Sequence, residues 1–190
     1  MNRITLAAIG GALLMYSPSI QAQASSAVSG FNDVPWSISA AGLESMLGPA
    51  AHSEELELGI TVYAYRDSVA GVASVAMYAV LDSLGMVKGQ HAVELDPDHS
   101  CDEQYRELRD YVKLTYPLLT PVENQDIQTW DDFCTAFREG KASWATQWRD
   151  PDTGTVVTVL LEPEAPVIKV IFESAQFIAW LQARQDSTAN

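Results

Sequence analysis

Hydrophobic and polar residues alternate along three consecutive segments in the first half of the chain. This period of two predicts β-strands. The three segments cover residues 58–66, 69–81 and 86–95. Short turns at 67–68 and 82–85 separate them, so we expect an antiparallel meander.

The same alternation returns near the C-terminus and predicts a second meander. Its three segments cover residues 142–149, 155–162 and 167–173. The sequence Asp-Pro-Asp-Thr-Gly over 150–154 is a strong turn between the first two segments. Trp144 and Trp148 lie on one side of their strand, where we expect them to be buried.

Apolar residues spaced three or four apart predict helices between and around the two meanders. The clearest helix is expected at 102–116, where Tyr105, Leu108, Val112 and Tyr116 form an apolar stripe. Shorter helices are expected at 40–47, 130–139 and 175–183.

This order of elements predicts an α+β fold. We expect an antiparallel sheet of about six strands in two three-stranded meanders, with helices packed on one face. The chain has 190 residues, enough for one ordinary domain, which we place at 31–183. Residues 25–30 are small and polar and are expected to form a flexible leader, 118–129 a loop, and 184–190 a polar tail.

The N-terminus has the pattern of a secretory signal peptide over residues 1–24. Arg3 precedes an apolar run over 4–16, and Ala22 and Ala24 supply the small residues that a signal peptidase reads. The run is shorter than the roughly 20 residues that span a bilayer. We therefore expect a periplasmic or secreted protein that keeps no membrane anchor after cleavage.

The charge of the chain is strongly negative, with 25 acidic and 11 basic residues and a formal net charge of −14. Such a surface repels phosphate backbones, so we do not expect nucleic acid as a partner. An acidic surface instead suits a basic protein partner.

The two cysteines, Cys101 and Cys134, predict a disulfide in an exported chain. On the chain-entropy model, closing a loop of this length stabilises the fold by about 4 kcal/mol. Two free buried thiols or a metal-binding pair are the alternatives, although the spacing is not that of zinc ligands.

Three short motifs resemble those of small exported bacterial proteins. Trp36-Ser37 precedes a helix that ends at Gly48-Pro49, and Tyr116-Pro117 closes the second helix. This layout resembles the β-lactamase-inhibitor-like and outer-membrane-assembly-lipoprotein folds. The chain has Ser37 where glycine is usual, and it lacks the lipid-bearing cysteine of the assembly lipoproteins. The resemblance implies a non-enzymatic binding protein.

One acidic segment has the oxygen spacing of a calcium-binding loop. Its candidate ligands are Asp96, Asp98, Asp102 and Glu107. Cys101 stands where such a loop needs glycine, and the preceding segment is predicted to be a strand. We therefore interpret the segment as an acidic turn that leads into a helix, with no metal and no cofactor expected.

Catalytic signatures are weak along the whole chain. His91 alternates with apolar residues, which favours a histidine of the core or an edge over a metal ligand. Ser74 lies in a predicted strand and has no Gly-x-Ser-x-Gly context. We do not expect an enzyme; a small carboxylate- or metal-dependent hydrolase is the alternative.

The tyrosines of the first meander are the candidate binding residues. If Ile60 and its alternating neighbours face the helices, Tyr63, Tyr65 and Tyr78 lie on the opposite, open face of the sheet. Exposed tyrosines anchor interfaces well, whereas a second small core is the alternative. We therefore expect an exported, soluble, non-catalytic protein that binds or inhibits another protein. A carrier of a small apolar ligand is a further alternative.

Overall fold

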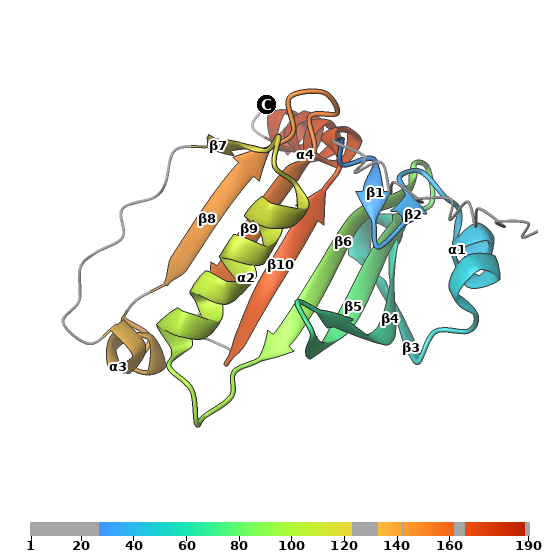
Figure 1. The fold of residues 1–190 in the computed structure, drawn as a ribbon. Helices are drawn as coiled ribbons and strands as arrows, with labels where there is room; N and C mark the ends of the chain where they lie inside the picture. The colour runs from blue at the N-terminus through green and yellow to red at the C-terminus, as the bar shows by residue number, and fades with distance from the viewer. Residues whose placement is uncertain (1–26, 123–132, 142, 162–165, 189–190) are drawn as a thin grey trace, which may run out of the picture.

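The computed structural model describes residues 27–122, 133–141, 143–161 and 166–188, which form an α+β fold (Figure 1). The predicted signal peptide lies outside these residues. The helices are α1 (Ala40–Leu47), α2 (Cys101–Thr115), α3 (Phe133–Arg138) and α4 (Ala175–Thr188), with a 3₁₀ turn, η1 (Glu57–Gly59). The strands are β1 (Gly30–Phe31), β2 (Val34–Pro35), β3 (His52–Leu56), β4 (Ile60–Val69), β5 (Val72–Leu81), β6 (Gly85–Glu94), β7 (Thr120–Val122), β8 (Trp144–Arg149), β9 (Val156–Leu161) and β10 (Val167–Glu173).

The main sheet has eight antiparallel strands in the order β3-β4-β5-β6-β10-β9-β8-β7. The two predicted meanders, β4–β6 and β8–β10, are both present and join through β6 and β10. In each half a helix precedes the four strands of the sheet, α1 before β3–β6 and α2 before β7–β10, although α3 lies between β7 and β8. A half-turn about the β6–β10 pair relates the two halves in strand order.

The sheet has two more strands than the six expected. The edge strand β3 has five exposed residues and no alternation of apolar with polar side chains, so its sequence carries no strand signal. At the other edge, β7 is three residues long and lies in the segment expected to be a loop. Both strands form because their neighbours offer free backbone donors and acceptors.

One face of the sheet, which we call the covered face, carries α2 and the β1–β2 hairpin. In Figure 1 α2 lies in front of β9, between β8 and β10, and the hairpin lies in front of β5 and β6. The ring of Tyr105 on α2 stacks on Trp144 with a centroid distance of 4.4 Å. Its hydroxyl donates to the carbonyl of Val159 at 3.1 Å, and burial raises the pKa of Tyr105 to about 12. Trp144 and Trp148 are buried, as predicted.

The β1–β2 hairpin is held on the sheet by Phe31. The Phe31 ring occupies the space above Gly89, where a Cβ atom would lie 2.1 Å from the ring. The same ring contacts Tyr78 and Phe172, with centroid distances of 5.0 and 5.3 Å. At the tip of the hairpin, Asn32 and Asp33 have φ angles of 50° and 62°, as a two-residue hairpin turn of this hand requires.

The structure describes residues 27–30 of the segment expected to be a flexible leader, and burial and hydrogen bonds hold this part against the domain. Val28 is buried, and its backbone N–H donates to the carboxylate of Asp150. Its carbonyl accepts hydrogen bonds from Thr155 Oγ1 and Trp36 Nε1. The packed domain therefore begins before Phe31, because the turn after β8 binds this segment.

Helix α4 lies at one end of the sheet and packs on the face opposite α2. Its residue Phe177 forms a separate apolar cluster with Leu81 and Val87. The helices are therefore not all on one face. The helix also continues beyond the expected end at residue 183, and residues 181–187 are exposed.

None of the helices among the described residues is long and apolar enough to cross a membrane.

The Asp150 carboxylate accepts backbone N–H groups from Val28, Asp152 and Thr153. Burial acts to raise its pKa, but these donors outweigh burial and hold the pKa of Asp150 below the ordinary 3.8. We expect Asp150→Ala to lower the free energy of unfolding by about 2–4 kcal/mol, because buried donors lose their acceptor. Urea denaturation at pH 7 measures this change.

The matched control for Asp150 is Asp152→Ala, which removes an exposed carboxylate from the same turn. The control should change the free energy of unfolding by less than about 0.5 kcal/mol. In the wild type the contribution of Asp150 is complete above pH 3.8 and is lost as the pH falls through the lower pKa of the folded state. Equal effects of the two substitutions would contradict the role of Asp150.

Candidate functional site

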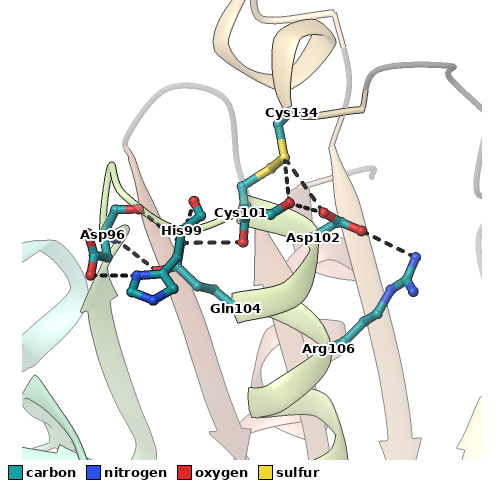
Figure 2. The surroundings of a disulfide bond; sticks show 8 residues. Asp96, His99, Cys101, Asp102, Gln104, Arg106 and Cys134 are labelled. Atoms are coloured by element: carbon teal, nitrogen blue, oxygen red, sulfur yellow. Dashed lines mark hydrogen bonds and ion pairs between the residues drawn. A yellow bond between two sulfur atoms is a disulfide. The ribbon is translucent and has the colours of Figure 1, made fainter.

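The disulfide between Cys101 and Cys134 is confirmed, with a Cα–Cα distance of 5.8 Å. It joins the first residue of α2 to α3 (Figure 2), and no other cysteine is present. A disulfide of this kind is consistent with an oxidising compartment.

Two carboxylates of the acidic turn before α2, those of Asp96 and Asp102, have partners nearby in the chain. Asp96 accepts the backbone N–H of Asp98 at 2.9 Å and pairs with His99 Nδ1 at 2.8 Å (Figure 2). Those hydrogen bonds lower the pKa of Asp96. Asp102 accepts from Ser100 and pairs with Arg106 at 3.3 Å.

The four candidate calcium ligands do not converge on one point. Glu107 lines a surface pocket with Leu108 and Tyr111. Among the residues that the structure describes, no group of three or more His, Cys, Asp or Glu side chains is placed to hold a metal ion.

Tyr63, Tyr65 and Tyr78 lie on one face of the sheet, as the alternation predicts, but it is the covered face. Tyr78 is 2% exposed within the main core, and Tyr63 and Tyr65 pack against that core. The Tyr65 ring meets Tyr78 edge-on at 5.5 Å. The expectation that these side chains point away from the helices is therefore wrong, and Ile60 and Val62 take the other face. No observation tests their role in partner binding.

A polar network around the buried His91 lies beneath the hairpin tip and reaches the exposed Asn32 and Asp67. His91 is 3% exposed, as expected for a core histidine. Its Nδ1 lies 3.0 Å from Ser74 Oγ, and its Nε2 lies 3.1 Å from Asn32 Oδ1. Asn32 Nδ2 in turn donates to the Asp67 carboxylate at 2.6 Å and faces the Tyr78 hydroxyl at 3.4 Å.

These partners fix where the protons lie. A carboxylate only accepts, so the amide nitrogen of Asn32 must face Asp67, and its oxygen must face His91. Nε2 of His91 therefore carries the hydrogen, which leaves Nδ1 to accept the hydroxyl proton of Ser74. Burial lowers the pKa of His91 from its ordinary 6.5, although the charge of Asp67 acts in the opposite direction.

The network places a nucleophile, a base and an orienting amide in line, as nucleophilic catalysis requires. The network also anchors the hairpin, because Asn32 belongs to the hairpin whereas Ser74 and His91 belong to the main sheet. Sequence reasoning missed the arrangement because Asn32, Ser74 and His91 lie far apart in the chain and match no local motif. The only local signal was the alternation that indicates burial of His91.

Away from the end that α4 covers, the opposite side of the sheet forms a broad surface, which we call the uncovered face. We define it by three rows of side chains that run from β4 to β8. The strand registers place them as Arg66, Val75, Ala92, Lys169, Leu160 and Ala145; Ala64, Met77, Gln90, Ile171, Thr158 and Gln147; and Val62, Ala79, Lys88, Glu173, Val156 and Arg149. All of these side chains except Val156 are half-buried or exposed.

The uncovered face is much more apolar than a solvent-facing sheet. An antiparallel sheet with one open face normally alternates apolar residues inside with polar residues outside. Here the outward positions on β5 are Val75, Met77 and Ala79, and Val75 is 43% exposed. On β10, Ile171 lies outward between Lys169 and Glu173.

Comparisons with protein-family models, with curated proteins and with solved structures find no match to this chain.

His91 should make stability depend on pH near neutrality. Its pKa is lower in the folded chain than the ordinary 6.5, so below that pH the unfolded chain takes up the proton more readily. The free energy of unfolding should therefore fall between pH 7.5 and 5.5, by at most about 1.4 kcal/mol per pH unit. Urea denaturation at the two pH values measures the slope.

His91→Gln should abolish this slope, because glutamine can still bridge Ser74 and Asn32 but does not titrate. His52→Gln is the matched control, since His52 is exposed on β3, and it should keep the slope. An unchanged slope in His91→Gln would show that the network does not carry the effect.

Proposed function

We propose that the protein is a non-catalytic binding protein of an extracytoplasmic compartment that binds another protein through the uncovered face. The observation that carries this proposal is the run of outward apolar side chains, with Met77 and Ile171 near its centre. Large exposed apolar patches on folded domains mark interaction sites. The resemblance to small exported binding proteins supports the same function.

The size of the uncovered face favours a protein partner. Six strands spaced about 4.8 Å apart and three rows about 7 Å apart give a footprint of roughly 600 Å². This is the share of one partner in a small but specific interface. Four of its positions, Ala64, Ala79, Ala92 and Ala145, are alanines, so a partner's backbone can approach the sheet closely.

A carrier of a small apolar ligand gains less support from the structure. Such a ligand would lie between the sheet and the helices. In the described residues the centre of that layer is filled by large side chains, among them the fully buried Trp148, Tyr105 and Phe31, and the pocket between α2 and the β4–β5 turn lies at the surface.

Met77→Glu should weaken binding by roughly 10- to 100-fold, because it places a charge in the centre of the proposed interface. The partner is first captured from an envelope extract of the native host on immobilised wild-type protein. Its affinity for each variant is then titrated. Circular dichroism and the melting temperature check that the variant is folded.

The matched control is Leu114→Glu, the same kind of change on α2, where the side chain is 84% exposed. It should leave the affinity within twofold of the wild type. Capture that is insensitive to Met77→Glu, or equally sensitive to both substitutions, would rule out the uncovered face.

The second candidate function is acyl-group hydrolysis, which the hydrogen bond from Ser74 to His91 favours. Ser74 Oγ would attack an ester carbonyl, and its proton would pass through His91 Nδ1 to the leaving alcohol. Water would then release the acyl group by the same route. However, Asp67 lies directly opposite Ser74 on β4, and its charge would repel the oxyanion that forms there.

A fluorophosphonate probe separates the two functions, because it labels activated serines covalently. Under the binding function we expect no labelling of Ser74 by mass spectrometry of the native protein. Ser53, an exposed serine on β3, gives the background level. Labelling of Ser74 above that level, and its loss in His91→Gln, would establish the hydrolase instead.

A further inference from the structure

Four basic side chains lie on the uncovered face and form two pairs related by the half-turn of the fold. Gln90 pairs with Ile171 in the β6–β10 ladder, and this pair lies in the middle row of the uncovered face. A half-turn about this point exchanges Lys88 with Lys169, because each lies two residues from this pair on its own strand.

The two arginines obey the same half-turn. Arg66 lies in the same row as Lys169, with Val75 and Ala92 on the two strands between them. Arg149 lies in the same row as Lys88, with Val156 and Glu173 on the two strands between them. Strand spacings put the lysines about 14 Å apart near the centre and the arginines about 27 Å apart at opposite corners.

Negative charge is scarce on the same face. Among the described strand positions on this side of the sheet, the acidic residues are Glu54, Glu94 and Glu173. Glu173 already pairs with Lys88 at 2.9 Å, and the other two lie at the margin. The face is therefore neutral to slightly basic in a chain whose formal net charge is −14.

The local charge reverses the expectation drawn from the whole chain. Net charge favours a basic partner, but a basic surface placed on this face would meet Arg66 and Arg149. Burying like charges against one another costs several kcal/mol and disfavours such a partner. Carboxylates of a partner would instead make charge-assisted hydrogen bonds with these basic side chains, and each arginine can bind a carboxylate through two parallel hydrogen bonds.

Resting on the proposed function, we propose that the partner is a protein whose contact surface is apolar at its centre and acidic around it. Its carboxylates meet Arg66 and Arg149 and lie beside Lys169, which also has an interaction within the chain, while its apolar centre covers Met77 and Ile171. A protein fits better than a membrane. The three defined rows present alanines and no aromatic side chain to insert among lipids, and the chain as a whole is repelled by anionic headgroups.

Zero-length carbodiimide cross-linking tests the sign of the partner's charge directly, because the reagent joins a lysine to a carboxylate only in contact. The probe is the protein captured from envelope extract of the native host on the full-length mature chain. We expect a cross-linked peptide between Lys169 and an Asp or Glu of the captured protein. Lys169→Gln should remove it.

A charge-matched pair of variants gives the affinity. Arg66→Gln with Arg149→Gln removes two charges from the uncovered face and should weaken binding at least tenfold. Arg109→Gln with Lys113→Gln removes two charges from α2 on the other side and should change binding less than twofold. Both variants change net charge equally, so only position distinguishes them.

The outcomes separate this inference from the proposed function. In one outcome Met77→Glu abolishes capture, removal of the two arginines strengthens it, and cross-links join Glu94 to lysines of the partner. The uncovered face then binds a basic protein, so this inference fails while the proposed function stands. If no captured protein is sensitive to Met77→Glu, both fail. The wild type is also sedimented with phosphatidylglycerol vesicles. If it binds the vesicles and the variant without the two arginines does not, the uncovered face binds a membrane and the inference is overturned.

Discussion

The pairing of β6 with β10 is the contact on which the rest of the structure depends. Each half of the chain supplies a helix and four strands, and neither half alone gives α2 and the hairpin a common sheet to cover. Seven residue pairs join the two strands, from Val167–Glu94 to Glu173–Lys88. Because these two strands are central, the alternation of their side chains decides, through the strand registers, which side chains of the neighbouring strands lie on each face.

The N-terminal hairpin completes the covered face by filling the space beside α2. Its Phe31 ring can lie on the sheet only because position 89 is glycine. Its tip is then oriented by Asn32, whose amide meets both Asp67 and His91. One polar network thus holds the hairpin, sets the tautomer of the buried His91 and orients Ser74. Anchoring accounts for all of these contacts, and the charge of Asp67 disfavours catalysis at the same place.

The long strands and helices could be predicted because each has a clear period. The stripe on α2 and the alternation of β8 both identify buried residues correctly, including Tyr105, Trp144 and Trp148. The face of β4 could not be predicted, since Tyr63 and Val62 are both apolar and alternation alone does not say which side is inside. The half-turn arrangement of Arg66, Lys88, Arg149 and Lys169 was also hidden, because it follows from registers between strands distant in the chain.

The sequence by itself determined the α+β class, both meanders and the disulfide, because these depend on local periodicity and on two cysteines that have only each other as partners. The tertiary structure alone decided which face is covered and where the edge strands β3 and β7 lie. It also brought Asn32, Ser74 and His91 into contact. Such features depend on which surfaces meet after the halves join, and that choice is made by packing between residues far apart in the chain.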